Sequence, residues 1–93
     1  MKTFNDLEFK IHPSGVMFGV QARIDFDNGY GASIVRGPYT YGGDEGLYEL
    51  AVFDENGITY STPITNDVEG NLTEDDVTKL LEQIQLLEVA PKN

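Results

Sequence analysis

The chain contains no cysteine, so neither a disulfide framework nor a thiolate metal site is available to it. Long hydrophobic runs are also missing, and no stretch approaches the roughly 20 apolar residues that a membrane-spanning helix needs. Residues 1–6 are not followed by the apolar run of a signal peptide. These absences predict a cytoplasmic location and no membrane partner.

Positive charge is scarce as well. Six Lys and Arg residues stand against 16 Asp and Glu residues, which gives a net charge of −10. Acids and bases balance within residues 1–43, so the whole excess lies in residues 44–93. An acidic surface repels phosphate groups, and no glycine-rich phosphate loop opens a helix. We therefore expect no direct nucleic-acid binding, whereas a partner with a basic surface would suit this charge.

Groups that could carry catalysis are few. The single histidine, His12, stands before Pro13 in a predicted turn, and the chain offers no second histidine to share a metal. The serines lack a histidine–acid partnership of the kind a nucleophile needs. The acidic segment 25–29 resembles a calcium loop only loosely, because Arg36 stands where the closing acid is required. We expect no catalytic residues, no metal site and no cofactor.

What the chain does have is enough apolar residues, 40%, for one core. We expect a single domain over residues 1–93, with ragged ends at about 1–5 and 90–93. Alternation of apolar and polar residues predicts strands over 7–11, 16–26, 30–36, 47–53 and 58–62. The Asn28-Gly29 and Asn56-Gly57 pairs predict hairpin turns, since both residues of such a pair tolerate positive φ.

The last predicted element is a helix that begins after Thr73. Thr73 is a good N-cap, and Asp76 three residues later completes a capping box with the shorter acid. One apolar stripe follows at helical spacing. Its residues are Val77, Leu80, Leu81, Ile84 and Leu87. The predicted fold class is α+β: an antiparallel sheet of four to five strands, built from two hairpins and packed against one C-terminal amphipathic helix.

The segment 36–48 is the most distinctive candidate for an interaction loop. Tyrosine and arginine are the residues that anchor protein interfaces, and here they stand among several glycines with two acids beside them. The candidate residues are Arg36, Tyr39, Tyr41, Asp44, Glu45 and Tyr48. The alternative is structural: the tyrosines cover the edge of the sheet, and the glycines only turn the chain.

The block DNGYGASIVRGPYTYGGDEGLYELAV, residues 27–52, resembles small uncharacterised proteins encoded by tailed bacteriophages and prophages. The similarity continues through Thr62-Pro63-Ile64 and Asp67-Val68 before Leu72-Thr73, and it covers most of the chain after residue 15. It implies expression in a bacterial host cytoplasm and a role in infection or lysogeny. It implies no activity, cofactor or catalytic residue.

Three functions stay open. The leading hypothesis is a non-enzymatic phage or prophage accessory protein that binds a host or phage protein, or itself as a homodimer. The second is an acidic nucleic-acid mimic that inhibits a host defence or DNA-binding protein, although a solvated face is the commoner role of such acids. The third is a small ligand-binding module, which would require a pocket lined by Arg36 and the tyrosines.

Overall fold

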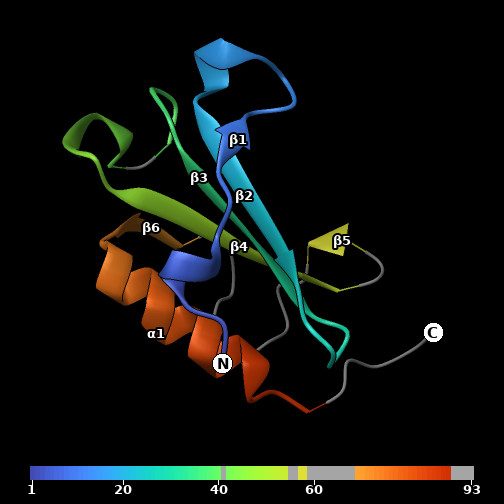
Figure 1. The fold of residues 1–93 in the computed structure, drawn as a ribbon. Helices are drawn as coiled ribbons and strands as arrows, with labels where there is room; N and C mark the ends of the chain where they lie inside the picture. Colours follow the sequence, from blue (N-terminus) through green and yellow to red (C-terminus); the bar gives the residue numbers. More distant parts are fainter. Residues whose placement is uncertain (41, 55–56, 59–68, 89–93) are drawn as a thin grey trace.

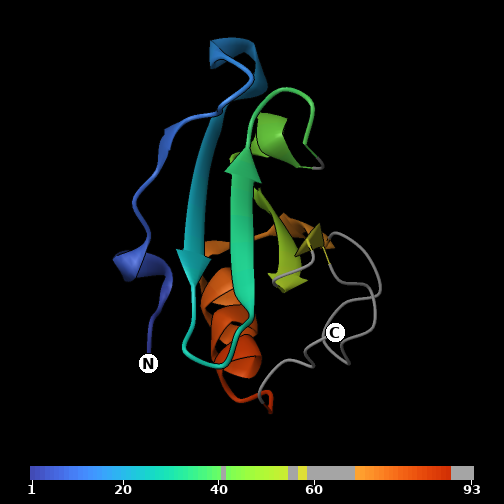
Figure 2. The same cartoon turned by 90° about the vertical axis from the view of Figure 1, so that its right-hand side faces the viewer.

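The computed structural model describes residues 1–40, 42–54, 57–58 and 69–88. Within these residues the chain forms one antiparallel sheet with an α-helix, α1, along one of its faces (Figures 1 and 2). The strand order is β1-β2-β3-β4-β5, and β6 also pairs with β4, so the sheet is five strands wide. The elements are β1 Lys10–Ile11, β2 Val20–Asp25, β3 Gly31–Arg36, β4 Tyr48–Asp54, β5 Gly57–Ile58, β6 Glu69–Leu72 and α1 Glu74–Gln85. The predicted α+β class, an antiparallel sheet packed against one C-terminal helix, is confirmed.

The core lies between the sheet and α1. Alternate residues of the two central strands point toward the helix, as period-2 patterning requires, and the three innermost residues of the helical stripe meet them. These residues are Ala32, Ile34, Leu50, Val52, Val77, Leu81 and Ile84, each exposed by 1% or less. Leu80 of the predicted stripe is half-buried at the margin of this cluster.

The hairpin between β2 and β3 confirms the predicted turn at Asn28-Gly29. The strands pair from Val20–Arg36 to Asp25–Gly31. The N–H of Gly29 donates to the carbonyl of Phe26 at 3.2 Å, and Gly29 alone in the turn has positive φ, at 88°. The loop is a three-residue turn closed by a left-handed glycine, so Asn28 does not use the positive φ that it tolerates.

Asn28 has a different task, which connects the hairpin to the helix. Its Nδ2 donates to the carbonyls of Ile84 at 2.8 Å and Leu87 at 3.1 Å, at the C-terminal end of α1. Its Oδ1 accepts from the N–H of Tyr30 at 3.1 Å. The last carbonyls of a helix lack intrahelical partners, so Asn28 supplies from the sheet a cap that the helix sequence does not contain.

The other end of α1 is capped as predicted. The Thr73 hydroxyl accepts from the N–H of Asp76 at 3.1 Å, and the Asp76 carboxylate accepts from the N–H of Thr73 at 3.0 Å. The hydrogen bond that the Thr73 N–H donates to this carboxylate, supported by the Thr73 side chain, lowers the pKa of Asp76 from its ordinary value of 3.8. The capping box is therefore strongest while Asp76 is ionised.

We expect this cap to make part of the free energy of unfolding depend on pH. Because the pKa of Asp76 is lower in the folded chain than in the unfolded one, its contribution is complete above the unfolded pKa and is lost as pH falls through the folded pKa. Urea unfolding of wild type and Asp76→Asn, from about pH 6 down to about pH 2, should show wild type more stable at the upper end and this advantage disappearing below pH 3.8. An advantage independent of pH would contradict this assignment.

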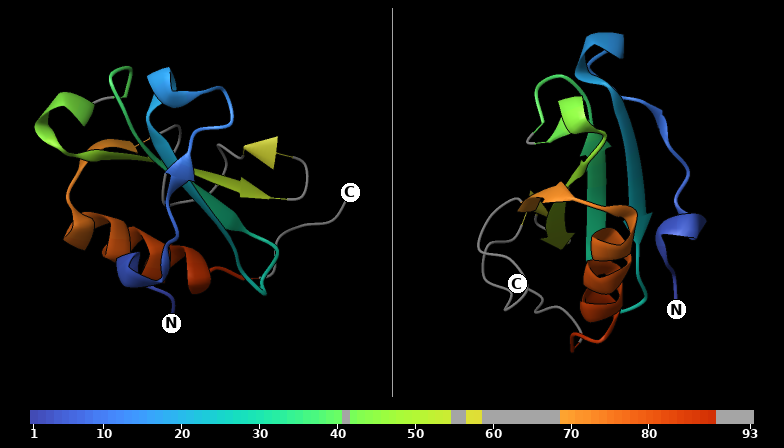
Figure 3. Two further views of the ribbon diagram at one scale, coloured as in Figure 1. Left: turned by 45° about the horizontal axis from the view of Figure 1, so that its top comes forward. Right: turned by 90° about the vertical axis from the view of Figure 1, so that its left-hand side faces the viewer.

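The backbone at the start of the chain is hydrogen-bonded to α1. The backbone N–H of Lys2 donates to the Gln85 side chain at 2.9 Å, Gln85 donates back to the Lys2 carbonyl at 2.8 Å, and the N–H of Phe4 donates to the Thr78 hydroxyl at 3.1 Å. The short 3-10 turn η1, Phe4–Asp6, lies beside the helix (Figure 3). Residues 2–4, expected to be ragged, thus form specific contacts.

Strand β1 is shorter than predicted. Only Lys10–Ile11 of the predicted strand 7–11 pairs with β2. Leu7 and Phe9 pack against the core instead, where the Phe9 ring lies 5.5 Å from that of Tyr48. Burying these side chains draws the N-terminal segment away from the edge of the sheet.

The β4–β5 pairing, with Asp54 opposite Gly57, confirms the second predicted hairpin. The remainder of the predicted strand 58–62 lies outside the described residues beyond Ile58. Strand β6 was not predicted, because its sequence EGNL shows no apolar alternation. Its backbone is also irregular, since Asn71 has a positive φ of 56°. In the described part of the chain, no helix combines the length and apolar character needed to cross a membrane.

Candidate interaction surface

The predicted strand 16–26 does not begin at residue 16. Val16–Phe18 form a 3-10 turn, η2, and β2 begins only at Val20. Gly15 and Gly19 bracket this turn with φ of 114° and 88°, conformations that L-residues with side chains rarely adopt. The two glycines break the alternation, so Val16 and Phe18 do not belong to β2 as the predicted strand required.

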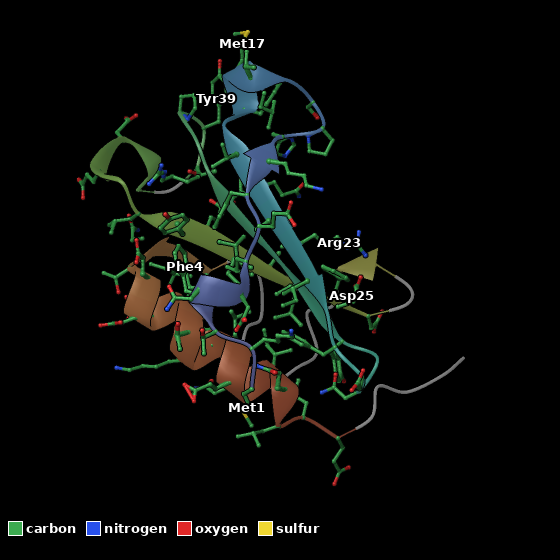
Figure 4. All side chains as sticks on the ribbon, viewed as in Figure 1. Met1, Phe4, Met17, Arg23, Asp25 and Tyr39 are labelled. Carbon is green, nitrogen blue, oxygen red and sulfur yellow. The ribbon has the colours of Figure 1, made fainter. Side chains whose placement is uncertain are left out.

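The result is a set of large apolar side chains at one end of the molecule. Val16, Met17 and Phe18 are exposed by 72%, 66% and 43%, and Tyr39, in the loop after β3, by 69%. The Phe18 ring lies 5.6 Å from the Tyr39 ring, which joins the two loops. We call these four residues the apolar tip; Figure 4 shows Met17 and Tyr39 together at this end of the sheet.

The tip stands on a close crossing of two backbones. A Cβ on Gly19 would lie 2.1 Å from the carbonyl oxygen of Arg36 and 2.6 Å from the Cα of Gly37. A Cβ on Gly37 would lie 2.5 Å from the carbonyl oxygen of Phe18. No side chain fits between these segments. The crossing therefore holds the turn that carries Phe18 against the loop that carries Tyr39.

A hydroxyl locks the second loop. The Thr40 Oγ1 accepts from the N–H of Gly37 at 3.0 Å and donates to the Gly37 carbonyl at 2.9 Å. On the other side of the tip, the N–H of Ser14 donates to the His12 Nδ1 at 3.1 Å, and the His12 ring lies 5.8 Å from Phe18. His12 thus supports the tip.

The segments that build the tip are free of carboxylates. Residues 9–24 and 28–43 contain no Asp or Glu, whereas they contain the bases Lys10, Arg23 and Arg36. In a chain with a net charge of −10, the tip is thus built from segments without acidic side chains, and the loop that carries Tyr39 meets its first acids at Asp44 and Glu45. Contiguous exposed apolar side chains on a small domain mark interaction sites more often than scattered ones do.

The described residues of the predicted interaction loop lie in different surroundings, and two of them belong to the core or contact it. Tyr48 is only 7% exposed, and its ring lies 5.1 Å from Phe4 and 5.5 Å from Phe9. Arg36 is bound to it: Nη1 donates to the Tyr48 hydroxyl at 3.3 Å, and the guanidinium carbon lies 5.2 Å from the ring centroid. Tyr48 is therefore a core residue whose hydroxyl is satisfied by Arg36.

The remaining predicted residues lie in different places. Asp44 and Glu45 are exposed on a third 3-10 turn, η3, Gly43–Glu45, which follows the tip in sequence. Tyr41 lies outside the described residues. Among the described residues of the predicted set, Tyr39 alone belongs to the tip. The sequence signal for the other three tip residues was the pair of glycines around Val16–Phe18, which interrupts an otherwise regular alternation.

The cavities of the molecule give less support for a binding site than the tip does. An open cleft of about 570 Å³ lies between the N-terminal segment and the end of β2, and Arg36, Tyr39 and Tyr48 are not among its lining residues. In the part of the chain that the structure describes, no three His, Asp or Glu side chains are grouped to hold a metal ion. The pocket that the ligand-binding hypothesis required, lined by Arg36 and the tyrosines, is not this cleft.

Comparison with protein-family models, with curated proteins and with solved structures finds no match for this chain.

Proposed function

We propose that this protein is a non-enzymatic accessory protein that acts by binding another protein, and that the apolar tip is its contact surface. The observation that carries the proposal is the tip itself: Val16, Met17 and Tyr39 are each exposed by about two thirds or more on a backbone crossing that fixes their positions. Rigid aromatic and Met side chains of this kind supply the central contacts of protein interfaces. The phage resemblance supports a host or phage protein as the partner.

The free energies of burial and of association indicate how the tip would act. Burying one Val, Phe or Met side chain is worth about 1.5–3 kcal/mol, so four partly exposed side chains supply about 6 kcal/mol. Loss of translational and rotational freedom on association costs about as much or more. The tip is therefore an anchor that needs contacts around it. A partner with a basic surface would gain them from the acidic half of the chain, which also raises the association rate.

The test begins with the partner. A photo-crosslinking residue at position 17 should label one protein in a bacterial host that expresses the chain. The affinity of that purified protein should then fall at least tenfold for Met17→Ser and for Tyr39→Ser, since tenfold corresponds to only about 1.4 kcal/mol. Leu86→Ser is the matched control, because Leu86 is 71% exposed but follows the C-terminal end of α1. Equal affinities for all three variants would refute a contact through the tip.

Salt dependence separates the charge-mimicry hypothesis from this one. An inhibitor that uses carboxylates in place of phosphates would bind a basic protein with an affinity that falls steeply as salt rises. Tip variants would then bind normally. Binding anchored by the tip predicts a strong response to Met17→Ser at every salt concentration, even where a basic partner adds some dependence on salt.

A further inference from the structure

The outer edge of β2 is only partly covered. Strand β1 pairs with Val20 and Gln21 and then ends at Lys10, whereas β2 continues to Asp25. The chain before Lys10 no longer pairs with β2, because Phe9 and Phe4 pack on Tyr48 in the core, and it lies across an open cleft from the end of β2. Within the described residues, the last part of β2 therefore has a strand partner only on its β3 side.

Hydrogen bonds show which backbone groups face this open edge. The N–H of His12 donates to the carbonyl of Gly19 at 3.0 Å, so Gly19 faces β1. The N–H of Phe26 donates to the carbonyl of Tyr30 at 2.8 Å on the opposite side. Because the direction alternates along a strand, Arg23 and Asp25 turn their N–H and C=O groups outward, as Gly19 does. These two residues offer four backbone groups to an added strand.

Their side chains lie on one face of the sheet and carry opposite charges. The Arg23 Nη2 lies 3.9 Å from the Asp25 Oδ1, and the two side chains are 63% and 75% exposed. The guanidinium carbon of Arg23 also lies 3.9 Å from the centroid of the Phe53 ring, which holds Arg23 over the sheet. Figure 4 shows Arg23 and Asp25 extending to the same side of β2. The open edge thus presents one positive and one negative side chain on the same face of the sheet, while Ile24 between them faces the core.

We infer that this edge pairs with β2 of a second copy of the chain, antiparallel about a two-fold axis at Ile24. In that register each Arg23 lies opposite Asp25 of the second copy, and all four outward backbone groups find partners. Opposite charges directly across an antiparallel pair are favourable, whereas like charges are unfavourable. A shift by two residues would place Arg23 opposite Arg23, or Asp25 opposite Asp25. Backbone and side chains therefore select the same register.

The geometry predicts the form of the dimer. The two sheets become one continuous sheet, and two-fold pairing is the commonest symmetry of homo-oligomers. The tip precedes β2 in the chain, so antiparallel pairing places the two tips at opposite ends of the assembly. With a short edge and a net charge of −10 on each copy, we expect weak association, in about the micromolar to millimolar range. Such a dimer would be bivalent for a partner of the tip.

A charge exchange tests the register. Sedimentation equilibrium should show a reversible dimer of the wild-type chain. Asp25→Arg, which would place arginines opposite one another, should weaken association at least tenfold even though it reduces the overall net charge. Arg23→Asp should do the same, and the double variant Arg23→Asp with Asp25→Arg should restore association. Restoration cannot arise from simple loss of folding. Thermal unfolding of each variant verifies that it is folded.

Matched controls complete the design. Glu45→Arg changes the net charge by the same amount on the exposed turn η3 and should not weaken association. Met17→Ser should not weaken it either, which separates this edge from the tip. In the dimer, amide exchange of Arg23 and Asp25 should slow as protein concentration rises. A chain that stays monomeric at about 1 mM, a dimer insensitive to Asp25→Arg, or a double variant that fails to recover would overturn the inference.

Discussion

Gly19→Ala should destabilise the protein by about 3 kcal/mol or more and displace the apolar tip. The new Cβ would lie 2.1 Å from the carbonyl oxygen of Arg36 and 2.6 Å from the Cα of Gly37. Both are backbone atoms of the neighbouring loop, so no side-chain rotation can relieve the collision. The φ of 88° adds strain of its own, because a side chain disfavours this conformation. Urea unfolding followed by circular dichroism measures the loss.

Gly15→Ala is the control for that variant. Gly15 also has positive φ, 114°, and it belongs to the same turn, but a Cβ there would meet no atom within 4 Å. We expect it to cost only the conformational strain, about 1–2 kcal/mol. The difference between the two variants measures the backbone crossing. Equal losses would mean that the crossing adds nothing and that the tip is held in another way.

Asn28→Asp should lower the free energy of unfolding by about 3 kcal/mol at neutral pH, although it only replaces the amide NH2 group by an oxygen. The amide donates to the carbonyls of Ile84 and Leu87. A carboxylate cannot donate, and it would place a negative charge at the negative end of the helix dipole. Loss of two hydrogen bonds and gain of a repulsion act together. Urea unfolding of the purified variant gives the change in free energy.

Two comparisons isolate the cause. Asn28→Ala removes the donors without adding charge and should cost less, about 2 kcal/mol. Asp27→Asn changes the neighbouring residue, which is exposed in the same loop, and should stay within about 0.5 kcal/mol of wild type. The repulsion also raises the pKa of the introduced acid, so Asn28→Asp should regain part of its loss as pH falls and the acid is protonated. An Asn28→Asp protein as stable as Asn28→Ala at neutral pH would contradict the electrostatic part.

Binding of a partner through the tip and self-association through the β2 edge use separate surfaces of this fold. The tip is apolar and lies at one end of β2, whereas the pairing edge is polar and lies at the other end. Met17→Ser and Asp25→Arg therefore test different surfaces. A protein that fails in one assay can still succeed in the other, which makes each proposal independently refutable.

Local sequence was sufficient for the elements whose determinants lie close together in the chain. Helix α1 begins after Thr73 because the hydroxyl and the carboxylate that cap it are three residues apart. Its apolar stripe and the alternation in β3 and β4 determine which faces meet, so the α+β class followed from periodicity alone. The turn at Gly29 followed from the same kind of short-range signal.

Tertiary structure decided the rest, since the partners are distant in sequence. Asn28 caps a helix 56 residues away, Tyr48 is buried by Phe4 and Phe9 from the other end of the chain, and β6 pairs with β4 without an apolar pattern of its own. Alternation placed Val16 and Phe18 in a strand that the structure begins only at Val20. The crossing of Gly19 over Gly37 turned them outward, because two backbones in contact leave no path for the strand to continue, and periodicity cannot register a contact between segments that are not neighbours in the chain.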